Sequence, residues 1–367
     1  MVTERASMLL GSGPGEPTGS QVASWEPRTS TRAPPDDRRL ERKEAGGEPM
    51  TAHRGNSQEA LLAEAAAFGD AVLADISAMV LRGRGRAQTE LKGRFDVVTE
   101  ADHQVESHFA EALARRFPEH RMFGEEYVSR RADDPAGPCW VLDPIDGTVN
   151  FAAGIPLFSV SLALLDNGVP LLGWVVDPLH QETFHARRGA GASLNGEPLG
   201  AVGSGSSGSD SANVDSAEGE DAESQAAGDE AEDVEVLPLG ASSEFVDRLV
   251  RHDPRIVMQL AQRFGKFRNL GSQALQLCYV AAGRLRGTLS CETKLWDDAA
   301  GSLIAMEAGR RYSKLDGTDV FPVRAEDPSW QGKPIGSICA TRGDHAALVR
   351  LLAPMVHARS ARGDDSS

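Results

Sequence analysis

The 367-residue sequence predicts a mixed α/β (α+β) fold, and three observations lead to this class. Two stretches with apolar residues at helical spacing come first, a meander of short apolar strands follows, and strands alternate with helices in the last third of the chain. The length allows one large domain or two medium ones, and 40% hydrophobic residues are enough to form a core.

Composition divides the chain into five predicted parts. Residues 1–55 lack periodic apolar positions and are rich in Gly, Pro, Ser and charge, so we expect a disordered tail, and Met50 could be the true start. The other parts are an N-terminal α+β half (56–200), a disordered acidic insertion in a surface loop (201–235), a C-terminal α/β half (236–356) and a polar tail (357–367).

The first half begins with two predicted helices. Apolar residues recur at helical spacing over residues 58–81 and again over about 101–116. Thr99 or Asp102 would cap the second helix, a contribution of about 1 kcal/mol. Residues 121–124 form a short apolar strand after it.

A β-meander is predicted next. Residues 140–142 are an apolar run that Asp143-Pro144 is expected to stop. Asn-Gly pairs between apolar runs are strong hairpin signals. We therefore expect further strands at 158–165, 171–176 and 182–186, with hairpin turns at 166–168 and 194–197.

The C-terminal half shows the alternating pattern of an α/β layer. Pro254 stands in the first turn of one expected helix, and Ser272 would cap the next. Strands are expected at 236–239, 266–270, 286–291 and 311–314, and helices at 254–264, 272–282, 296–308 and 344–352.

Charge and cysteine usage limit the class of protein. Eleven acidic residues and no Lys or Arg lie between Ala201 and Leu237, so the formal charge of −16 leaves about −5 for the rest of the chain. Without a basic surface, we expect no nucleic-acid partner. No apolar run has the length of a membrane span, and the four scattered cysteines show neither disulfide nor zinc spacing, so we expect a cytoplasmic protein without membrane contact.

Acidic residues gather at three strand or helix ends, as the pairs Glu125/Glu126, Asp143/Asp146 and Asp297/Asp298. Each pair taken alone is typical of a turn or a solvated surface. Crowded carboxylates repel one another unless a cation lies between them, and Mg²⁺ prefers such oxygen ligands. Together with Asp102, the pairs are what a two- or three-metal phosphoryl-transfer site needs.

Four segments, in this order, resemble the inositol monophosphatase family of Mg²⁺-dependent, lithium-sensitive phosphatases: DVVTEAD, FGEE, WVLDPIDGTVNF and LWDDAAG. The resemblance covers about residues 57–352, interrupted by the acidic insertion. It implies a layered α/β/α/β/α sandwich of the sugar-phosphatase type. It also implies a phosphomonoesterase that acts on a small phosphorylated substrate with two to three Mg²⁺ ions.

The resemblance assigns metal ligands position by position. Glu125, Asp143 and the Ile145 carbonyl would hold the first Mg²⁺. Asp143, Asp146 and Asp297 would hold the second. Glu125 also resembles the ligand of a third, weaker ion, and Glu126 would stand behind it.

The same resemblance assigns the catalytic and phosphate-binding groups. Thr148 and Asp102 would orient and deprotonate the attacking water, with Glu125 as the third catalytic residue. The amides of Gly147 and Thr148 would receive phosphate, at a site that Asp146 and Asp297 share. Lys92 resembles a loop lysine near the family's site. Asp146→Asn is expected to abolish activity and leave the fold intact.

One departure from the family concerns the alcohol part of the substrate. Inositol-processing members carry a glutamate seven residues before the aspartate of the WD motif, where Ser290 stands here, and the nearest acid is Glu292. Inositol phosphate therefore competes with histidinol phosphate, a sugar phosphate and a nucleotide 3′-phosphate. A different class, a non-catalytic binding protein that keeps the fold, is a further alternative. Family members commonly form homodimers through the meander, so we expect a dimer.

Overall fold

The computed structural model describes residues 50–84, 89–91, 97–125, 135–200 and 237–360. The chain divides into two units, Met1–His53 and Arg54–Ser367, and only the first turn of a helix is described in the first unit. Most of the predicted N-terminal tail, the acidic insertion and the end of the polar tail lie outside the described residues. The rest of this section concerns the second unit.

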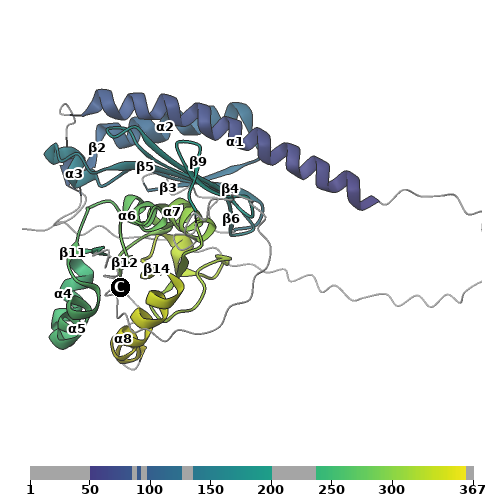
Figure 1. Ribbon diagram of the computed structural model, residues 1–367. Helices are drawn as coiled ribbons and strands as arrows, with labels where there is room; N and C mark the ends of the chain where they lie inside the picture. Colours follow the sequence, from purple (N-terminus) through teal and green to yellow (C-terminus); the bar gives the residue numbers. More distant parts are fainter. Residues whose placement is uncertain (1–49, 85–88, 92–96, 126–134, 201–236, 361–367) are drawn as a thin grey trace, which may run out of the picture. The chain divides into compact units, whose positions relative to one another are not determined.

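A seven-stranded sheet forms the centre of the first half (Figure 1). Its order is β3-β4-β5-β6-β7-β8-β9, with β3 and β4 parallel and the other neighbours antiparallel. The strands are β3 (Arg121–Gly124), β4 (Pro138–Asp146), β5 (Ser159–Asp166), β6 (Val169–Asp177), β7 (Glu182–Arg187), β8 (Gly191–Leu194) and β9 (Glu197–Pro198). The predicted meander is confirmed, including both hairpin turns, where Asn167 and Asn195 adopt positive φ.

The side chains of this sheet enter two cores, because successive residues of a strand point to opposite faces. Trp140 and Leu142 pack against α1 (Met50–Gly83) and α2 (Glu100–Arg116). Cys139 and Val141 face α6 (Gln273–Ala281) and α7 (Leu295–Glu307) on the other side. A Cβ at Gly173 of β6 would lie 3.0 Å from the carbonyl oxygen of Ala300, so glycine allows α7 to approach the sheet closely.

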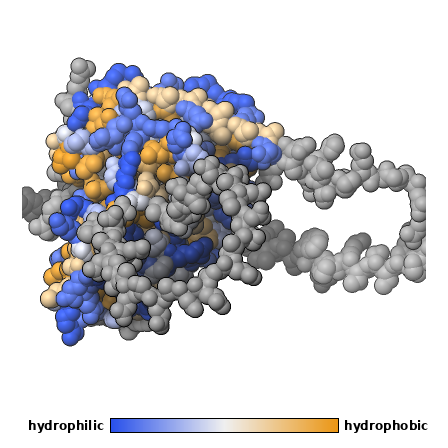
Figure 2. Space-filling model, in the orientation of Figure 1, coloured by the Kyte–Doolittle hydropathy of each residue, from blue (hydrophilic) through white to orange (hydrophobic). Residues whose placement is uncertain are grey.

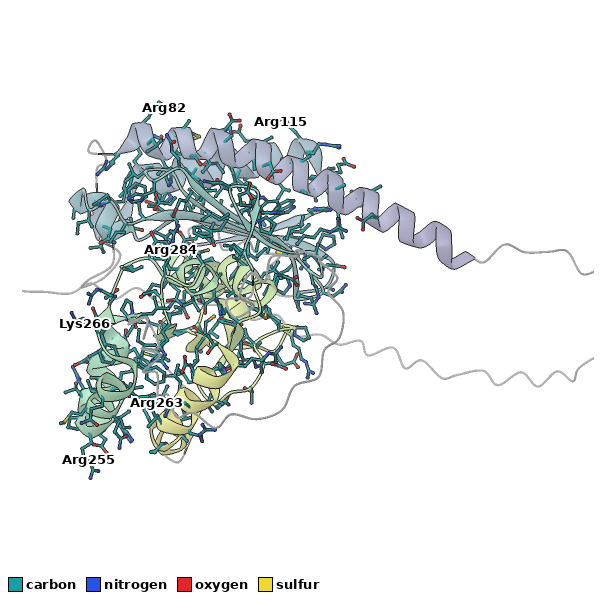
Figure 3. The ribbon with its side chains drawn as sticks, in the orientation of Figure 1. Arg82, Arg115, Arg255, Arg263, Lys266 and Arg284 are labelled. Atoms are coloured by element: carbon teal, nitrogen blue, oxygen red, sulfur yellow. The ribbon has the colours of Figure 1, made fainter. Side chains whose placement is uncertain are left out.

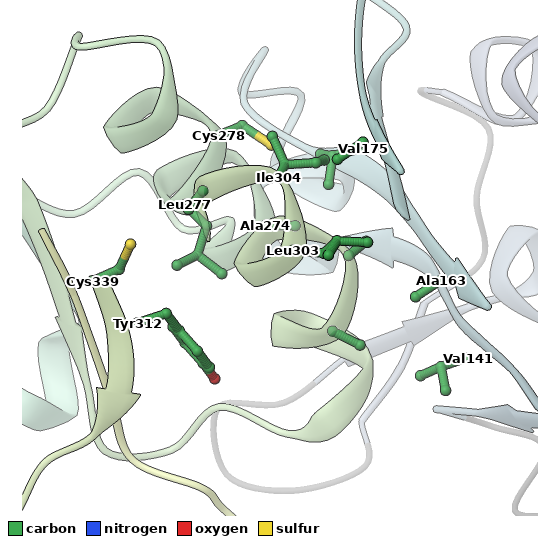
Figure 4. Close-up of a cluster of buried hydrophobic side chains, with 14 of the residues drawn as sticks. Val141, Ala163, Val175, Ala274, Leu277, Cys278, Leu303, Ile304, Tyr312 and Cys339 are labelled. Atoms are coloured by element: carbon green, nitrogen blue, oxygen red, sulfur yellow. The ribbon is translucent and has the colours of Figure 1, made fainter. Parts of the chain in front are cut away.

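A second sheet of five strands, ordered β11-β10-β12-β14-β13, covers the far side of α6 and α7. Its strands are β10 (Leu239–Ala241), β11 (Phe267–Arg268), β12 (Gly287–Ser290), β13 (Arg311–Lys314) and β14 (Ser337–Ala340). Figure 4 shows Tyr312 and Cys339 of this sheet on one side of α6 and α7, and Val141, Ala163 and Val175 of the first sheet on the other.

The outer face of the second sheet packs on the remaining long helices, α4 (Ser243–His252), α5 (Pro254–Phe264) and α8 (Arg342–Ser360). The shorter elements are β1 (Thr89–Leu91), β2 (Val97–Thr99), α3 (Thr148–Ala153) and the 3₁₀ turn η1 (Pro328–Gln331). The layers therefore run α/β/α/β/α, which confirms the predicted fold class (Figure 1).

Several element boundaries differ from the sequence prediction. β4 does not stop at Asp143-Pro144 but continues to Asp146, through a register shift in its pairing with β5. A bulge tolerates proline because the missing N–H is not needed there. α1 begins at Met50 instead of residue 58, and α8 runs past the expected 352, with Pro354 inside it.

Three elements of the second half were not predicted: α4, β14 and the 3₁₀ turn η1. α4 begins at Ser243, after the N-cap residue Ser242, whose hydroxyl accepts from the Phe245 amide; this serine cap was the available signal. β14 is a four-residue strand whose buried residues gave too short a pattern to separate from a loop. The strand predicted at 236–239 begins only at Leu239 within the described residues.

The visible surface has mixed hydropathy, and the cysteines lie in the interior. Figure 2 shows hydrophobic and hydrophilic residues interspersed on the visible face. The four cysteines are all buried, and no disulfide joins them among the described residues. Within the same ranges, no helix is both long and apolar enough to cross a membrane.

Candidate metal and phosphate site

The end of β4 places two of the predicted acidic residues in the interior. Asp143 and Asp146 are 1% and 7% exposed. β3 runs parallel to β4 with Gly124 opposite Leu142, so the next residue, Glu125, follows β3 beside Asp143. The strand ends therefore bring together residues that are about twenty positions apart in the sequence.

The third predicted carboxylate comes from α7. Asp297 lies in the first turn of this helix, where its Oδ2 accepts a hydrogen bond from the Lys294 amide at 2.7 Å. One carboxylate oxygen each of Asp143, Asp146 and Asp297 lies within 4.8 Å of the others, a grouping that could hold a metal ion. Two distant motifs of the sequence thus meet at one place.

The electrostatics of this group favour a cation. Burial raises the pKa of Asp143 well above its usual range, and Glu125, Asp146 and Asp297 raise it further. Burial likewise raises the pKa of Asp297, and it raises the pKa of Asp146 to about 6. In the part of the chain that the structure describes, no Lys or Arg forms an ion pair with these three aspartates. Figure 3 shows exposed cations elsewhere, among them Arg82, Arg115, Arg255, Arg263, Lys266 and Arg284.

Asp146 also connects the two halves of the domain. Its carboxylate accepts from the Ser272 hydroxyl at 2.5 Å and from the Gln273 and Ala274 amides at 3.1 and 2.7 Å. These amides belong to the N-terminal turn of α6, whose orphan N–H groups need acceptors. The three donors lower the pKa of Asp146 and offset part of the effect of burial.

The turn after β4 is held in a conformation that requires glycine. Gly147 has a φ of 96°, and a Cβ there would lie 2.9 Å from the Gly271 carbonyl oxygen. α3 follows directly, and the Thr148 hydroxyl donates to the Ile145 carbonyl at 2.9 Å. Ile145 is fully buried, and its carbonyl oxygen has a second lone pair besides the one that accepts from Thr148.

Asp102 is placed as a helix cap. It is 1% exposed, and its Oδ2 accepts from the amide and the hydroxyl of Thr99 at 2.8 and 2.6 Å, which forms a capping box at α2. The capping interpretation of the sequence is therefore confirmed. The pairing of Asp102 with Thr148 stays a prediction.

The acidic pair in the WD motif separates. Asp297 faces Asp143 and Asp146, whereas Asp298 is fully buried and bonds to Tyr312, Thr293 and Gln273. Consecutive residues in the first turn of a helix point about 100° apart, so both cannot face the same group. Glu126 and Lys92 lie outside the described residues.

Two sets of contacts that hold this site in place were not predicted from the sequence. The amides that bind Asp146 belong to residues 273 and 274, and only the Ser272 cap pointed to them. The Asn150 side chain donates to the carbonyls of Leu157 and Leu270, both at 2.7 Å, and so ties α3 to the loop before α6. A side-chain contact to a residue 120 positions away leaves no local signal.

The position of the missing family glutamate lies at the end of β12. Ser290 is fully buried there, and Glu292 follows it. Burial and a hydrogen bond to Glu244 of α4 together raise the pKa of Glu292 to about 7. Glu244 in turn accepts from Arg248 Nε at 2.9 Å. Glu292, Glu244 and Arg248 therefore form one hydrogen-bonded group.

Comparison with known proteins identifies the class. The family model described as "Inositol monophosphatase family" matches residues 57–356. This match covers most of the chain, so the protein belongs to the inositol monophosphatase family and is a phosphoric monoester hydrolase.

Individual relatives carry more than one name. The Nus factor SuhB of Pasteurella multocida is 34% identical over 235 residues, which are 64% of this chain and 78% of the relative. The inositol-1-monophosphatase of Bacillus subtilis is 30% identical over 222 residues, 60% of this chain and 74% of the relative. Among solved structures, an IMPase of Thermotoga maritima superposes with a TM-score of 0.60 at 27% identity, over 80% of this chain and 98% of that chain.

Proposed function

We propose that this protein hydrolyses a small phosphate monoester with Mg²⁺ held between β4 and α7. The observation that carries the proposal is the group of three carboxylate oxygens from Asp143, Asp146 and Asp297, all within 4.8 Å of one another. Their pKa values are raised by burial and further by neighbouring carboxylates. Such a group is stabilised by a divalent cation with oxygen ligands.

The donor set fits Mg²⁺. Glu125, Asp143 and the Ile145 carbonyl would hold one ion, and Asp143, Asp146 and Asp297 a second, with Glu125 serving a third. All are hard oxygen ligands. When bound, Mg²⁺ supplies charge neutralisation of the phosphate, a lowered pKa for water and stabilisation of the leaving alkoxide.

The chain's own groups would position water and phosphate. The Thr148 hydroxyl donates its only hydrogen bond to the Ile145 carbonyl. Its lone pairs can still accept a hydrogen bond from the attacking water. A pairing with Asp102 therefore requires this hydroxyl to turn. The Gly147 and Thr148 amides, at the tight turn after β4, would receive phosphate.

The residues expected to contact the alcohol part of the substrate differ from those of inositol-processing family members, because Ser290 stands in place of their glutamate. β10 and β12 are parallel, so Glu244 and Glu292 follow strands that end at the same edge of the sheet. From this edge the chain continues into α7 and Asp297. Carboxyl groups at that place support an alcohol with hydroxyl or ammonium donors, such as inositol phosphate or histidinol phosphate. A nucleotide 3′-phosphate remains the other candidate.

Partners beyond the substrate remain predictions. The homodimer and the absence of a nucleic-acid partner rest on the sequence expectations given above. Several relatives are named Nus factor, which makes a macromolecular partner worth testing as well.

The test is phosphate release from inositol 1-phosphate, histidinol phosphate, fructose 1,6-bisphosphate and adenosine 3′,5′-bisphosphate. Each would be measured with Mg²⁺, with EDTA and with added Li⁺. We expect one preferred monophosphate, with activity lost in EDTA and weakened by Li⁺. The Asp143→Asn variant, purified in the same way, reveals contaminating phosphatase. Hydrolysis that EDTA leaves unchanged would exclude the metal mechanism.

A further inference from the structure

Asp298 is a buried carboxylate that the proposed chemistry does not use. It lies in the first turn of α7 next to Asp297, and its side chain is fully buried. A buried carboxyl group without a cation is costly unless hydrogen-bond donors surround it. Asp298 therefore needs a specific reason to be where it is.

The donors around Asp298 are numerous and neutral. Its Oδ2 accepts from the Tyr312 hydroxyl at 2.7 Å and from the Thr293 hydroxyl at 2.9 Å. Its Oδ1 accepts from Gln273 Nε2 at 3.0 Å, and Ser337 adds a further hydrogen bond. Four donors suit an ionised carboxylate, which only accepts, better than a protonated one, which must also donate.

The orientation of the Gln273 amide is fixed by a second contact. Gln276 Nε2 donates to Gln273 Oε1 at 3.1 Å, so Gln273 must turn its nitrogen towards Asp298. Burial raises the pKa of Asp298, and its donors offset only part of that rise. The four neutral donors are arranged for an ionised carboxylate, and no Lys or Arg in the described part of the chain forms an ion pair with it.

Gln273 joins this charge to the metal-binding group. Its backbone amide donates to Asp146 while its side chain donates to Asp298. Asp298 also adjoins Asp297 in the chain, and its charge contributes to raising the pKa of Asp146. A fixed negative charge near the three carboxylates disfavours further negative charge there. At equal distance, its Coulomb energy with a divalent cation is twice its energy with a monovalent one.

We propose that Asp298 is a positioning residue for the cation site, whose negative charge strengthens Mg²⁺ binding and whose hydrogen bonds hold the first turns of α6 and α7 together. This inference rests on the proposed metal site. Asp298 touches neither the substrate nor the ion; it acts through Gln273, Asp146 and Asp297.

The test is isothermal titration of Mg²⁺ into the full-length, metal-free protein. Asp298→Asn removes the charge and keeps most of the shape, and we expect the Kd for Mg²⁺ to rise about ten-fold. Tyr312→Phe removes one donor but leaves the charge, and we expect its Kd to stay within about two-fold while its Tm falls. Asp75→Asn, at a side chain that is 73% exposed, is the charge-matched control.

The outcomes separate this inference from the proposed function. A folded Asp298→Asn protein that binds Mg²⁺ as tightly as wild type would overturn the inference and leave the metal site standing. A wild-type protein without Mg²⁺ binding would remove the metal site and the inference together. If Asp298→Asn does not fold, Asp298→Thr takes its place. Failure of both to fold would assign Asp298 to fold stability alone.

Discussion

Asp297 and Asp298 are neighbours in sequence, but their carboxylates lie in opposite kinds of surroundings. Asp297 meets Asp143 and Asp146, so that its burial is aggravated by like charges. Asp298 meets neutral donors from Tyr312, Thr293 and Gln273. A cation would complete the first arrangement in the proposed site, whereas hydrogen-bond donors already surround the carboxylate in the second. Burial of a carboxylate therefore does not mark a metal site; the kind of neighbour does.

The glutamate pair Glu244/Glu292, in the same half of the protein, is stabilised in a third way. Glu292 and Glu244 are joined by a hydrogen bond, and Arg248 pairs with Glu244. The raised pKa of Glu292 favours a proton on this carboxyl group near neutral pH, and the Arg248 guanidinium offsets the charge of Glu244. Removing one member of each group should therefore have very different consequences.

The largest effect is expected at Asp143, Asp146 and Asp297, whose negative charges no Lys or Arg of the described residues pairs with. Asp143→Asn removes one ligand charge, and we expect kcat/KM to fall about 10³-fold. The metal-free variant should be at least as stable as wild type, because a repulsive buried carboxylate is gone. Steady-state kinetics and urea unfolding in EDTA measure the two effects, with Asp75→Asn as the control.

Asp143 is a better site for this experiment than Asp146. The Asp146 carboxylate accepts from Ser272, Gln273 and Ala274, so an amide nitrogen at that position would face donors. Asp146→Asn is thus expected to disturb α6 as well as metal binding, which revises the expectation from the sequence that this variant leaves the fold intact. Near-native turnover of Asp143→Asn would contradict the ligand assignment.

A smaller effect, on the free energy of unfolding, is expected at Asp298, whose carboxylate is surrounded by hydrogen-bond donors. Tyr312→Phe leaves a buried carboxylate short of one donor, which costs about 1–3 kcal/mol. The half-buried Tyr279 offers a comparison away from Asp298: Tyr279→Phe keeps the ring contact with Arg284 at 4.9 Å and loses only the hydrogen bond between its hydroxyl and this exposed arginine. Chemical denaturation should show a lower midpoint for Tyr312→Phe alone. Equal losses in both variants would mean that the Asp298 network contributes no special stability.

The smallest effect is expected at the glutamate pair Glu244/Glu292 and depends on pH. Burial and the hydrogen bond to Glu244 together raise the pKa of Glu292 from 4.5 to about 7 in the folded protein. Between these values the folded state keeps a proton that the unfolded state has released, so the free energy of unfolding falls as pH rises through this window. Because Glu292 is partly exposed, the loss is discounted to about 1 kcal/mol.

Glu292→Gln removes this titration. Between pH 5 and pH 8, measured in EDTA, the wild-type protein should lose stability relative to the variant. Glu326→Gln, at an exposed position, should follow the wild type. Parallel pH profiles for wild type and Glu292→Gln would show that Glu292 does not hold this proton.

The sequence by itself determined the fold class and the principal acidic residues. Periodic apolar residues gave the helices of the first half, and Asn-Gly pairs gave the hairpins, because these signals are local. The family motifs singled out Asp143, Asp146 and Asp297, which the structure brings within 4.8 Å.

Only the tertiary structure decided how each acid is used. β4 continues past Pro144 because its partner strand allows a register shift. Asp298 leaves the metal group because Tyr312 and Gln273, on other elements, supply donors for it. The contacts of Asn150 with Leu270, and of Asp146 with α6, join residues 120 to 128 positions apart. Such contacts depend on how the two sheets pack on α6 and α7, and no local pattern encodes them.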